Sequence, residues 1–581
     1  MSSSGGTSSG ASSAEGTTTN GNSAPLAVND TIYATQDSLG VTVNLLDNDS
    51  DPDGDSISAI AEDLISETGG AITIAKNGTI SYLPPAGFWG TDSFGYSIED
   101  SEGATSSADV QVFVAPSAIT INDMFEQPSG FAIEGEVIGD AAGASLSGGE
   151  DFNQDGFSDL ILGAPRSDDN GNSSGKAYLV YGTPDTATIQ LSSVSDGVGG
   201  FAFTAEDEND DAGIDVSWAG DVNGDGDPDL LIGAEIASGP ISFSGRAYVV
   251  LGPVGSLSLV AAGNQGFVVN GEEPLGTFGE SVRRAGDVNA DGLDDIIIGA
   301  SRHNDNAGQS YVVFGKQDTD EVNGSDIHTG MGGFTINGSD GELSGRAVDG
   351  IGDVNGDGFA DLLVGAYSGD IPHGPNSGLA YVVFGKSDTD SVSLSQVATG
   401  SGGFVIVSES EGDWLGYTVA GVGDVNGDSI GDIVVAAPRA GTPSSGRVYV
   451  VFGKSGGAPV QLTEVTAGMG GYVITGTPSE QLGLQGVSGV GDVNADGLAD
   501  IAAIGMGPGY VFYGKTDTFS INAADASSGE VGFEVGPDAD AVSGAGDVNG
   551  DGVDDIAFSA WSVDGLGRTY VLFGVPTDPA R

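Results

Sequence analysis

Seven short segments of this chain repeat nearly the same pattern of oxygen-bearing side chains, the frame Asp-x-Asn-x-Asp-Gly-x-x-Asp. Carboxylate and amide oxygens are hard ligands, and Ca²⁺ binds six to eight of them at about 2.3–2.6 Å. In a tight turn the side chains at positions 1, 3 and 5 point inward together, and position 7 offers its backbone carbonyl. The pattern therefore predicts seven calcium loops, with about seven Ca²⁺ ions as the cofactor.

Each loop supplies five candidate ligands. Position 1 is Asp151, Asp221, Asp287, Asp353, Asp424, Asp492 and Asp547. Position 3 is Asn153, Asn223, Asn289, Asn355, Asn426, Asn494 and Asn549. Position 5 is Asp155, Asp225, Asp291, Asp357, Asp428, Asp496 and Asp551. Position 7, through its carbonyl, is Phe157, Asp227, Leu293, Phe359, Ile430, Leu498 and Val553. Position 9 is Asp159, Asp229, Asp295, Asp361, Asp432, Asp500 and Asp555.

Two positions of the frame indicate which kind of loop it is. Position 6 is Gly in six copies, which permits a sharp bend, and Ser429 in the fifth, where we expect strain and weaker calcium binding. Helix-flanked calcium loops need an acidic ligand at position 12. Here that position is apolar in every copy: Leu162, Ile232, Ile298, Val364, Val435, Ala503 and Phe558. The residues after position 9 read as β-strand, so we expect these loops to connect strands.

The segments around the loops repeat as well. Successive loops begin 55 to 71 residues apart, and each lies between a Gly-aromatic strand and a strand such as GRAYVVLG at 245–252. About four strands per unit cannot bury two faces alone, whereas seven sheets arranged radially can. The first Gly-aromatic strand, from Gly130, precedes the first loop, and the last unit lacks an outer strand. We therefore predict an all-β ring that residues 130–136 close by completing the seventh unit.

The repeat unit resembles the FG-GAP repeat of integrin α-subunit β-propellers. The pattern is carried by Phe278-Gly279 with Gly299-Ala300, by Leu415-Gly416 with Ala436-Ala437-Pro438, and by Gly163-Ala164-Pro165. The resemblance covers 129–577 and implies a seven-bladed β-propeller with calcium between strands one and two of a blade, on the lower face. This chain departs from integrins because all seven units carry the loop, and because the stalk, membrane span and partner subunit are absent.

Residues 25–115 have short alternating strands and turn signals such as Asn77-Gly78, typical of a β-sandwich. They resemble the cadherin-like or Ig-like domains of bacterial surface adhesins through AVNDTIYATQD, LLDNDSDPDGDSIS and NGTISYLPPAGFWGTDSFGYSIED. The resemblance implies calcium ligands at Asp30, Asp51, Asp53 and Asp100, and a solvated acidic loop is the alternative. Residues 1–24 are a Ser/Gly/Thr-rich disordered tether, and 116–128 are a linker.

Composition excludes several functions. The chain has 16 Lys and Arg against 84 Asp and Glu, for a net charge of −68, which argues against nucleic acid and anionic lipid as partners. It has no Cys, so packing and metal must stabilise it without disulfides. No apolar run approaches the ~18 residues of a membrane span. The first 24 residues lack the basic and apolar regions of a signal peptide, so we expect export through a signal outside this chain, or a piece of a larger protein.

Nothing in the sequence predicts catalysis. His303, His328 and His373 lack zinc-ligand spacing, and no Gly-x-Ser-x-Gly nucleophile elbow is present. We interpret Trp89, Trp218, Trp414 and Trp561 as core residues rather than sugar platforms. The links that vary among units, above all 301–308 and 366–378, lie opposite the loops, and we expect a ligand near blades three to five, since the upper loops of integrins bind ligands.

We therefore expect a non-enzymatic, extracellular, calcium-binding adhesion or ligand-binding module of a bacterial surface protein, with calcium in a structural role. Its partner would be a protein or glycan at the upper loops. Two alternatives remain open. One is a structural subunit of a surface layer, sheath or filament, which would bind copies of itself. The other is a lectin-like or non-catalytic part of a larger secreted enzyme.

Overall fold

The computed structural model describes residues 22–38, 40–60, 62–119, 130–252, 257–258, 265–370, 373–536, 539–562 and 565–577. Most of the expected tether and of the expected linker lies outside these residues. The chain forms two compact units, and the division between them falls at Ala115 and Pro116. Both units are built almost entirely from strands.

The first unit is a sandwich of two four-stranded sheets. One sheet has the order β1-β8-β7-β3 and the other β2-β6-β5-β4. The strands are β1 (Asp30–Thr35), β2 (Val41–Asn44), β3 (Ser58–Ala59), β4 (Glu62–Ile65), β5 (Ala71–Ile74), β6 (Thr79–Leu83), β7 (Gly90–Glu99) and β8 (Thr105–Ala115), with one 3-10 turn, η1 (Leu45–Asp47). Buried and exposed residues alternate along β7, so one face packs on the core that holds Tyr82, Trp89 and Tyr96.

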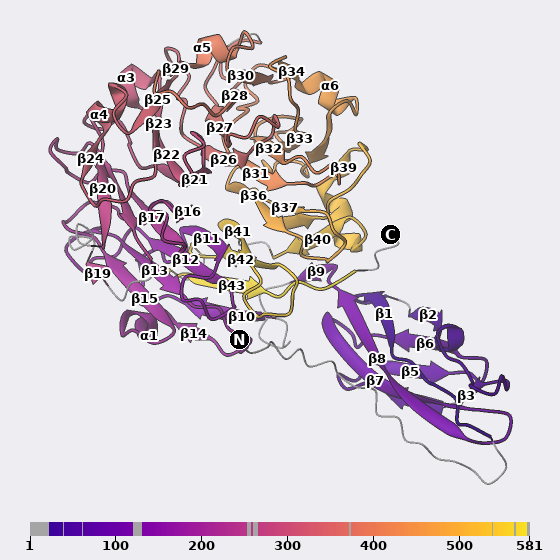
Figure 1. The fold of residues 1–581 in the computed structure, drawn as a ribbon. Coiled ribbons are helices and arrows are strands. Elements are labelled where there is room, and N and C mark those ends of the chain that lie inside the picture. The colour runs from indigo at the N-terminus through magenta and orange to yellow at the C-terminus, as the bar shows by residue number, and fades with distance from the viewer. Residues whose placement is uncertain are drawn as a thin grey trace. The chain divides into compact units, whose positions relative to one another are not determined.

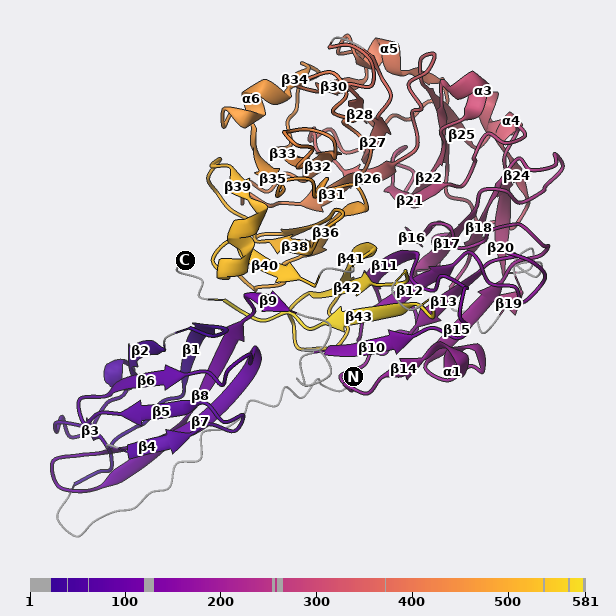
Figure 2. The same ribbon diagram turned by 180° about the vertical axis from the view of Figure 1, so that it is seen from behind.

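The second unit is a ring of seven five-stranded sheets, as Figures 1 and 2 show. It is a seven-bladed β-propeller, as the sequence predicts. We number the blades by their loops. The innermost strands of blades one to seven are β11 (Ser145–Glu150), β16 (Val216–Gly220), β21 (Ser281–Gly286), β26 (Val348–Gly352), β31 (Val419–Gly423), β36 (Gly486–Gly491) and β41 (Ala541–Gly546). Each contacts the innermost strand of the next blade, and β11 contacts β41.

The next two strands of each blade are its most buried. The second strands are β12 (Asp159–Ala164), β17 (Asp229–Ala234), β22 (Asp295–Ala300), β27 (Asp361–Ala366), β32 (Asp432–Ala437), β37 (Asp500–Ile504) and β42 (Asp555–Ser559). The third strands are β13 (Lys176–Val180), β18 (Arg246–Val250), β23 (Gln309–Val313), β28 (Leu379–Val383), β33 (Arg447–Val451), β38 (Gly509–Phe512) and β43 (Arg568–Leu572). Both sets read as continuous apolar runs because neighbouring blades cover both of their faces.

The outer part of each blade contains a Gly-aromatic strand and a two-residue strand. The fourth strands are β15 (Gly200–Thr204), β20 (Gly266–Asn270), β25 (Gly333–Asn337), β30 (Gly403–Val407), β35 (Gly471–Thr475), β40 (Gly532–Val535) and β10 (Gly130–Glu134). The fifth strands are β19 (Leu257–Ser258), β24 (Val322–Asn323), β29 (Val392–Ser393), β34 (Val460–Gln461), β39 (Ile521–Asn522), β9 (Ala118–Ile119) and β14 (Ile189–Gln190). Short helices follow several of the fifth strands: α1 (Leu191–Ser195), α4 (Gly324–His328), α5 (Leu394–Val397), α6 (Leu462–Thr466) and the 3-10 helix η4 (Ala523–Ser528). A further short helix, α3 (His303–Asn306), follows β22.

The ring is closed by two strands from the start of the unit. The strand β10 pairs antiparallel with β43 of blade seven, the closure that the spare Gly-aromatic strand predicts. The strand β9 also pairs with β40 of blade six, although it falls inside the segment predicted to be a linker. The estimate of about four strands per blade was one too low, because each fifth strand is a two-residue parallel pairing. Such a short pairing has no periodicity that a sequence can reveal.

The cores lie between neighbouring blades. Phe152, in the loop of blade one, packs on Trp218 of blade two, with ring centroids 6.3 Å apart. Trp89 and Trp218 are buried, as expected of core residues, but Trp414 and Trp561 are only partly buried, so that expectation was wrong for these two. Both lie at the end of the propeller where the innermost strands begin, which we call the upper face. The seven loops lie at the opposite end, the lower face.

Candidate functional site

The seven loops occupy the same place in all seven blades. Each begins directly after the innermost strand and ends where position 9 opens the second strand. In every blade the pairing of these two strands shifts by one residue immediately before the loop, as between Trp218 and Gly220 in blade two. Such a bulge bends the innermost strand and aims the loop. All seven loops lie wholly within the described residues.

The carboxylate at position 1 organises the turn. Its Oδ2 accepts the N–H of position 6 at 2.7–2.9 Å, and its Oδ1 accepts the N–H of position 5 at 3.0–3.1 Å, in all seven loops. The first three oxygen-bearing side chains of the frame are thereby held around one short turn. Gly at position 6 has φ between 89° and 95°, and Ser429 takes 68° in its place.

The carboxylate at position 9 is a buried connection between strands. One oxygen accepts the N–H of position 2 at 2.9–3.1 Å, and the other accepts the N–H of the Gly that follows the third strand at 2.7–2.9 Å. In each loop this Asp is at most 1% exposed. It therefore ties the loop to the bottom of the third strand, a structural role that the ligand pattern alone does not reveal.

Electrostatics at position 9 are unfavourable for a carboxylate without a cation. Burial, together with repulsion from the nearby Asp291 and Asp287, raises the pKa of Asp295 to about 8. The same causes raise the pKa of Asp229 and Asp361 to about 7. In each case the repelling charges are those at positions 5 and 1. A divalent cation among the three carboxylates would relieve this repulsion.

The donor set fits Ca²⁺ by chemistry. All candidate ligands are carboxylate, amide or carbonyl oxygens, which suit a hard cation. In blade three, Asn289 Oδ1 is buried without a hydrogen-bond partner, an acceptor left for a ligand. None of the seven loops brings three carboxylates together within 4.8 Å, a distance that the described residues reach only in the first unit. Ca²⁺ in a propeller loop would therefore also need the Asn amide and the position-7 carbonyl.

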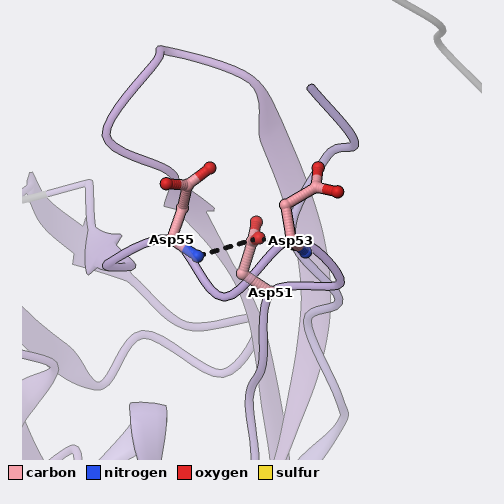
Figure 3. A group of neighbouring side chains, drawn as sticks. All are labelled: Asp51, Asp53 and Asp55. Atoms are coloured by element: carbon pink, nitrogen blue, oxygen red, sulfur yellow. Dashed lines mark hydrogen bonds between the residues drawn. The ribbon is translucent and has the colours of Figure 1, made fainter. Parts of the chain in front are cut away.

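That acidic group in the first unit consists of Asp51, Asp53 and Asp55 (Figure 3). Asp51 Oδ1 accepts the N–H groups of Asp53, at 2.8 Å, and of Asp55, at 3.2 Å, while Asp51 Oδ2 is buried without a hydrogen-bond partner. The sequence pointed to Asp51 and Asp53 but not to Asp55. The alternating Asp residues of SDPDGD were the available signal for this third carboxylate.

The other two predicted ligands of the first unit lie in different surroundings. Asp100 accepts the side-chain N–H of Asn22 at 2.8 Å and the N–H groups of Glu102 and Ala104. Asp30 lies beside Tyr96 and Asp49, and its burial raises the pKa of its carboxyl. The structure thus brings together two of the four predicted residues and adds Asp55.

The upper face carries a second repeated acid. Five blades have a buried Asp or Glu three residues before the Gly that precedes the innermost strand: Asp140, Asp210, Glu342, Asp413 and Glu480. Four of them accept the N–H of the residue three positions earlier, as in the pair Ser410 and Asp413 at 3.0 Å. Burial raises the pKa of Asp413 to about 6. Sequence reasoning missed this set, although its fixed spacing to Gly was visible.

A pocket of about 840 Å³ opens on the upper face at the centre of the ring. The first residues of the innermost strands and the links beside them line it. Both variable links singled out in the sequence contribute, through Ser301, Arg302 and Asn306 and through Tyr367 and Ser368.

Family comparisons agree with this architecture. Residues 22–113 match the family described as bacterial Ig domain. The FG-GAP repeat matches residues 142–180, 212–250, 278–313, 344–383 and 415–451. The chain thus carries an N-terminal bacterial Ig domain followed by FG-GAP repeats, as its sequence resemblance implied. The five matched segments cover the first three strands of blades one to five, and blades six and seven have the same strand order outside those segments.

The chain is also similar to parts of integrin α-subunits. Integrin alpha-4 of Xenopus laevis is 26% identical over 243 residues, which are 40% of this chain and 20% of that protein. Integrin alpha-IIb of Mus musculus is 33% identical over 159 residues, which are 25% of this chain and 14% of that protein. The similarity therefore spans a fifth or less of these relatives.

Among solved structures, one titled "Crystal structure of BBS1N in complex with ARL6DN, soaked with lead" is 10% identical, with a TM-score of 0.39. It covers 78% of this chain and 98% of that one. A likeness at that score does not establish a shared fold. Within the described residues, no helix has the length and apolar character to cross a membrane.

Proposed function

We propose that this chain is an extracellular, calcium-binding adhesion or ligand-binding module of a bacterial surface protein, in which calcium is structural. The observation that carries the proposal is the sevenfold repetition of one oxygen-ligand loop at one place in the blade. A loop that served a single binding event would not need seven copies. The FG-GAP repeats, the bacterial Ig domain and the integrin relatives support the adhesion role.

The proposed calcium would act through the turn that already exists. Positions 1, 3 and 5 surround the same short turn, and position 9 connects that turn to the third strand. Ca²⁺ bound to this turn would fix the lower end of three strands in each blade. A site saturated at 100 times its Kd contributes about 2.7 kcal/mol to folding. Seven such sites would dominate the stability of a chain without disulfides.

Calcium titration of the full chain tests the proposal. After removal of metal with EDTA, we expect calorimetry to count about seven propeller ions, and the melting temperature to rise as they bind. Asp221→Asn removes a position-1 ligand, so it should lower the ion count by one and lower the melting temperature more in calcium than in EDTA, where only a hydrogen bond of the turn is lost. Asp196→Asn, at an exposed site after α1, is the matched control. Equal melting temperatures with calcium and with EDTA would refute the proposal.

The same samples separate adhesion from self-assembly. A surface-layer or filament subunit would form large assemblies when calcium is added, whereas a ligand-binding module would remain at constant mass. Sedimentation velocity with and without calcium measures this difference. The adhesion proposal expects no growth in mass, and concentration-dependent growth would favour the structural alternative.

A further inference from the structure

The central pocket of the upper face gathers several of the few arginines of a strongly acidic chain. The chain has only 16 Lys and Arg residues, and three of them, Arg283, Arg302 and Arg346, line this pocket. Arg283 is neutralised by Asp215, with an N–O distance of 2.5 Å. Within the described part of the chain, neither Arg302 nor Arg346 has a carboxylate oxygen within 4.0 Å.

Among the described arginines, Arg166 and Arg439 also have no carboxylate oxygen within 4.0 Å, but each lies over a tryptophan ring and neither lines the pocket. At the start of the third strands β18 and β33, Arg246 pairs with Glu206 at 2.8 Å, and Arg447 pairs with Glu409. The guanidinium groups of Arg302 and Arg346 instead keep donors that match a carboxylate in bidentate geometry. Their placement at a pocket is therefore a property of this site and does not follow from composition.

An aromatic cluster adjoins these arginines. Trp414 and Tyr417 are stacked, with ring centroids 5.6 Å apart at 14°, and Tyr367 meets Tyr417 edge-on at 5.2 Å. The Arg346 guanidinium lies 4.2 Å above the Tyr417 ring and donates to Tyr417 Oη at 2.9 Å. Tyr367 and Tyr417 line the pocket, and Trp414 is only partly buried. Because Trp414 and Arg346 already stack on Tyr417 and Arg439 stacks on Trp414, the ring that the cluster offers a ligand is Tyr367, beside fixed positive charge.

The pocket also holds acceptors. Glu235 and Glu280 line it, and Glu280 is held in place by Ser301 N–H at 2.6 Å and by the Thr277 hydroxyl at 2.8 Å. Carboxylates at the wall of a polar pocket accept hydrogen bonds from ligand hydroxyls. The site thus combines donors for an anion, aromatic faces and acceptors for hydroxyl groups.

A sugar ring that carries a carboxylate meets all three requirements. Its carboxylate would pair with the guanidinium groups, its apolar ring face would pack on an aromatic ring, and its hydroxyls would reach the acidic side chains. We propose that the central pocket of the upper face binds a uronic-acid residue of an acidic saccharide, through Arg302 and Arg346 beside Tyr367 and Tyr417. This assignment rests on the proposed ligand-binding function and names its ligand class.

The net charge of −68 does not prevent an anionic ligand from binding. At about 0.15 M ionic strength the screening length is about 8 Å, so distant carboxylates contribute little inside the pocket. Inside the pocket the nearest groups matter most, so the ligand carboxylate must lie against Arg302 and Arg346 and its hydroxyls against Glu235 and Glu280. The same argument makes binding weaken at low salt, where long-range repulsion returns.

The test is calorimetric titration of the full chain, in excess calcium at about 0.15 M salt, with a glucuronate-containing trisaccharide. The methyl ester of the same trisaccharide keeps the ring and removes the charge. We expect the acid to bind at least tenfold more tightly than the ester, and Arg302→Gln and Arg346→Gln each to weaken acid binding at least tenfold. Arg166→Gln is the matched control, because Arg166 also lies over an aromatic ring, Trp561, and does not line the pocket. Its affinity should stay within twofold of the parent chain.

Several outcomes would overturn the assignment. These are failure of the acid to bind, equal affinity for acid and ester, or equal losses in Arg166→Gln and the pocket variants. Binding of a short Asp/Glu peptide in place of the saccharide would instead assign the pocket to acidic protein segments. Calcium titration in the same samples keeps the two proposals apart. Calcium binding by the loops together with no saccharide binding by the pocket would overturn only the ligand assignment.

Discussion

At the scale of single residues, position 6 of the calcium loops shows how backbone conformation limits the side chain. Gly358 has φ of 94°, as its counterparts in five other loops do within a few degrees. Ser429 occupies this position in blade five at 68°, a left-handed conformation that costs a non-glycine residue on the order of 1 kcal/mol or more. Its N–H still donates to Asp424 Oδ2 at 2.7 Å, so the loop keeps its hydrogen bonds.

We therefore predict that Ser429→Gly stabilises the propeller by about 0.5–1 kcal/mol, since relief of the strain exceeds the added flexibility of Gly in the unfolded chain. Thermal unfolding at fixed calcium measures the change. The reverse exchange, Gly358→Ser, is the matched comparison and should destabilise by a similar or larger amount. A lower melting temperature for Ser429→Gly would contradict the argument, because it would mean that the Ser side chain contributes more than its backbone costs.

The ligand side chains show which features of the site can be predicted from the sequence and which cannot. The frame of Asp, Asn and Gly was readable because the same residues repeat at fixed spacing. The buried connection made by Asp229 to the N–H of Gly252 was not readable, since those residues are 23 positions apart and meet only after β17 and β18 pair. Asp55 was overlooked for a different reason, because an isolated acidic loop has no repeats against which to compare it.

At the scale of elements, the close packing of each Gly-aromatic strand on its neighbour explains why its first residue is Gly. A Cβ on Gly130 would lie 2.1 Å from the carbonyl oxygen of Val571, and a Cβ on the equivalent Gly200 or Gly333 would lie 2.0 Å from a carbonyl oxygen of its third strand. Each fourth strand can therefore approach its third strand only if it begins with Gly. In blade seven this contact joins the two ends of the propeller sequence, so Gly130 belongs to the ring closure.

We predict that Gly130→Ala lowers the free energy of unfolding by about 1–3 kcal/mol, because the backbone of β10 or β43 must shift to admit the methyl group. Denaturant unfolding, followed by tryptophan fluorescence, reports the loss. Gly456→Ala supplies the control, since a Cβ there meets no atom within 4 Å, and it should change stability by less than about 0.5 kcal/mol. Equal effects of the two substitutions would show that β10 does not hold the ring together.

The elements also mark the limit of prediction from the sequence. The seven blades, their loops and the closure by β10 followed from repeats that are long enough to align. The closure by β9 did not, because a two-residue strand has no periodicity and its partner, β40, begins more than 400 residues later. Trp414 was interpreted as a core residue because it lies near the start of a blade, and nothing near it in the sequence shows that Arg439 stacks on its face at 3.3 Å.

At the scale of the whole molecule, net charge affects the stability of the folded chain relative to the unfolded chain. The charge of −68 is gathered into two compact units when the chain folds, and self-repulsion then opposes folding. Seven bound Ca²⁺ would cancel only about 14 of these charges. Those charges lie in the loops, however, where the carboxylates at positions 1 and 5 raise the pKa of the carboxyl at position 9. Added salt and bound calcium should therefore both reduce the repulsion among the loop carboxylates.

We expect the melting temperature to rise with salt concentration, and to rise less when calcium is bound. In EDTA, raising NaCl from about 0.01 M to 1 M shortens the screening length from about 30 Å to 3 Å and should raise the melting temperature by several degrees. With calcium saturating, the rise should be clearly smaller, because the closest repelling carboxylates are already neutralised. Scanning calorimetry of both forms across the salt series makes the comparison, and KCl must reproduce NaCl, since screening depends on ionic strength. Identical salt slopes with and without calcium would show that the loop carboxylates are not where the repulsion is concentrated, and would remove the electrostatic reason for seven metal sites.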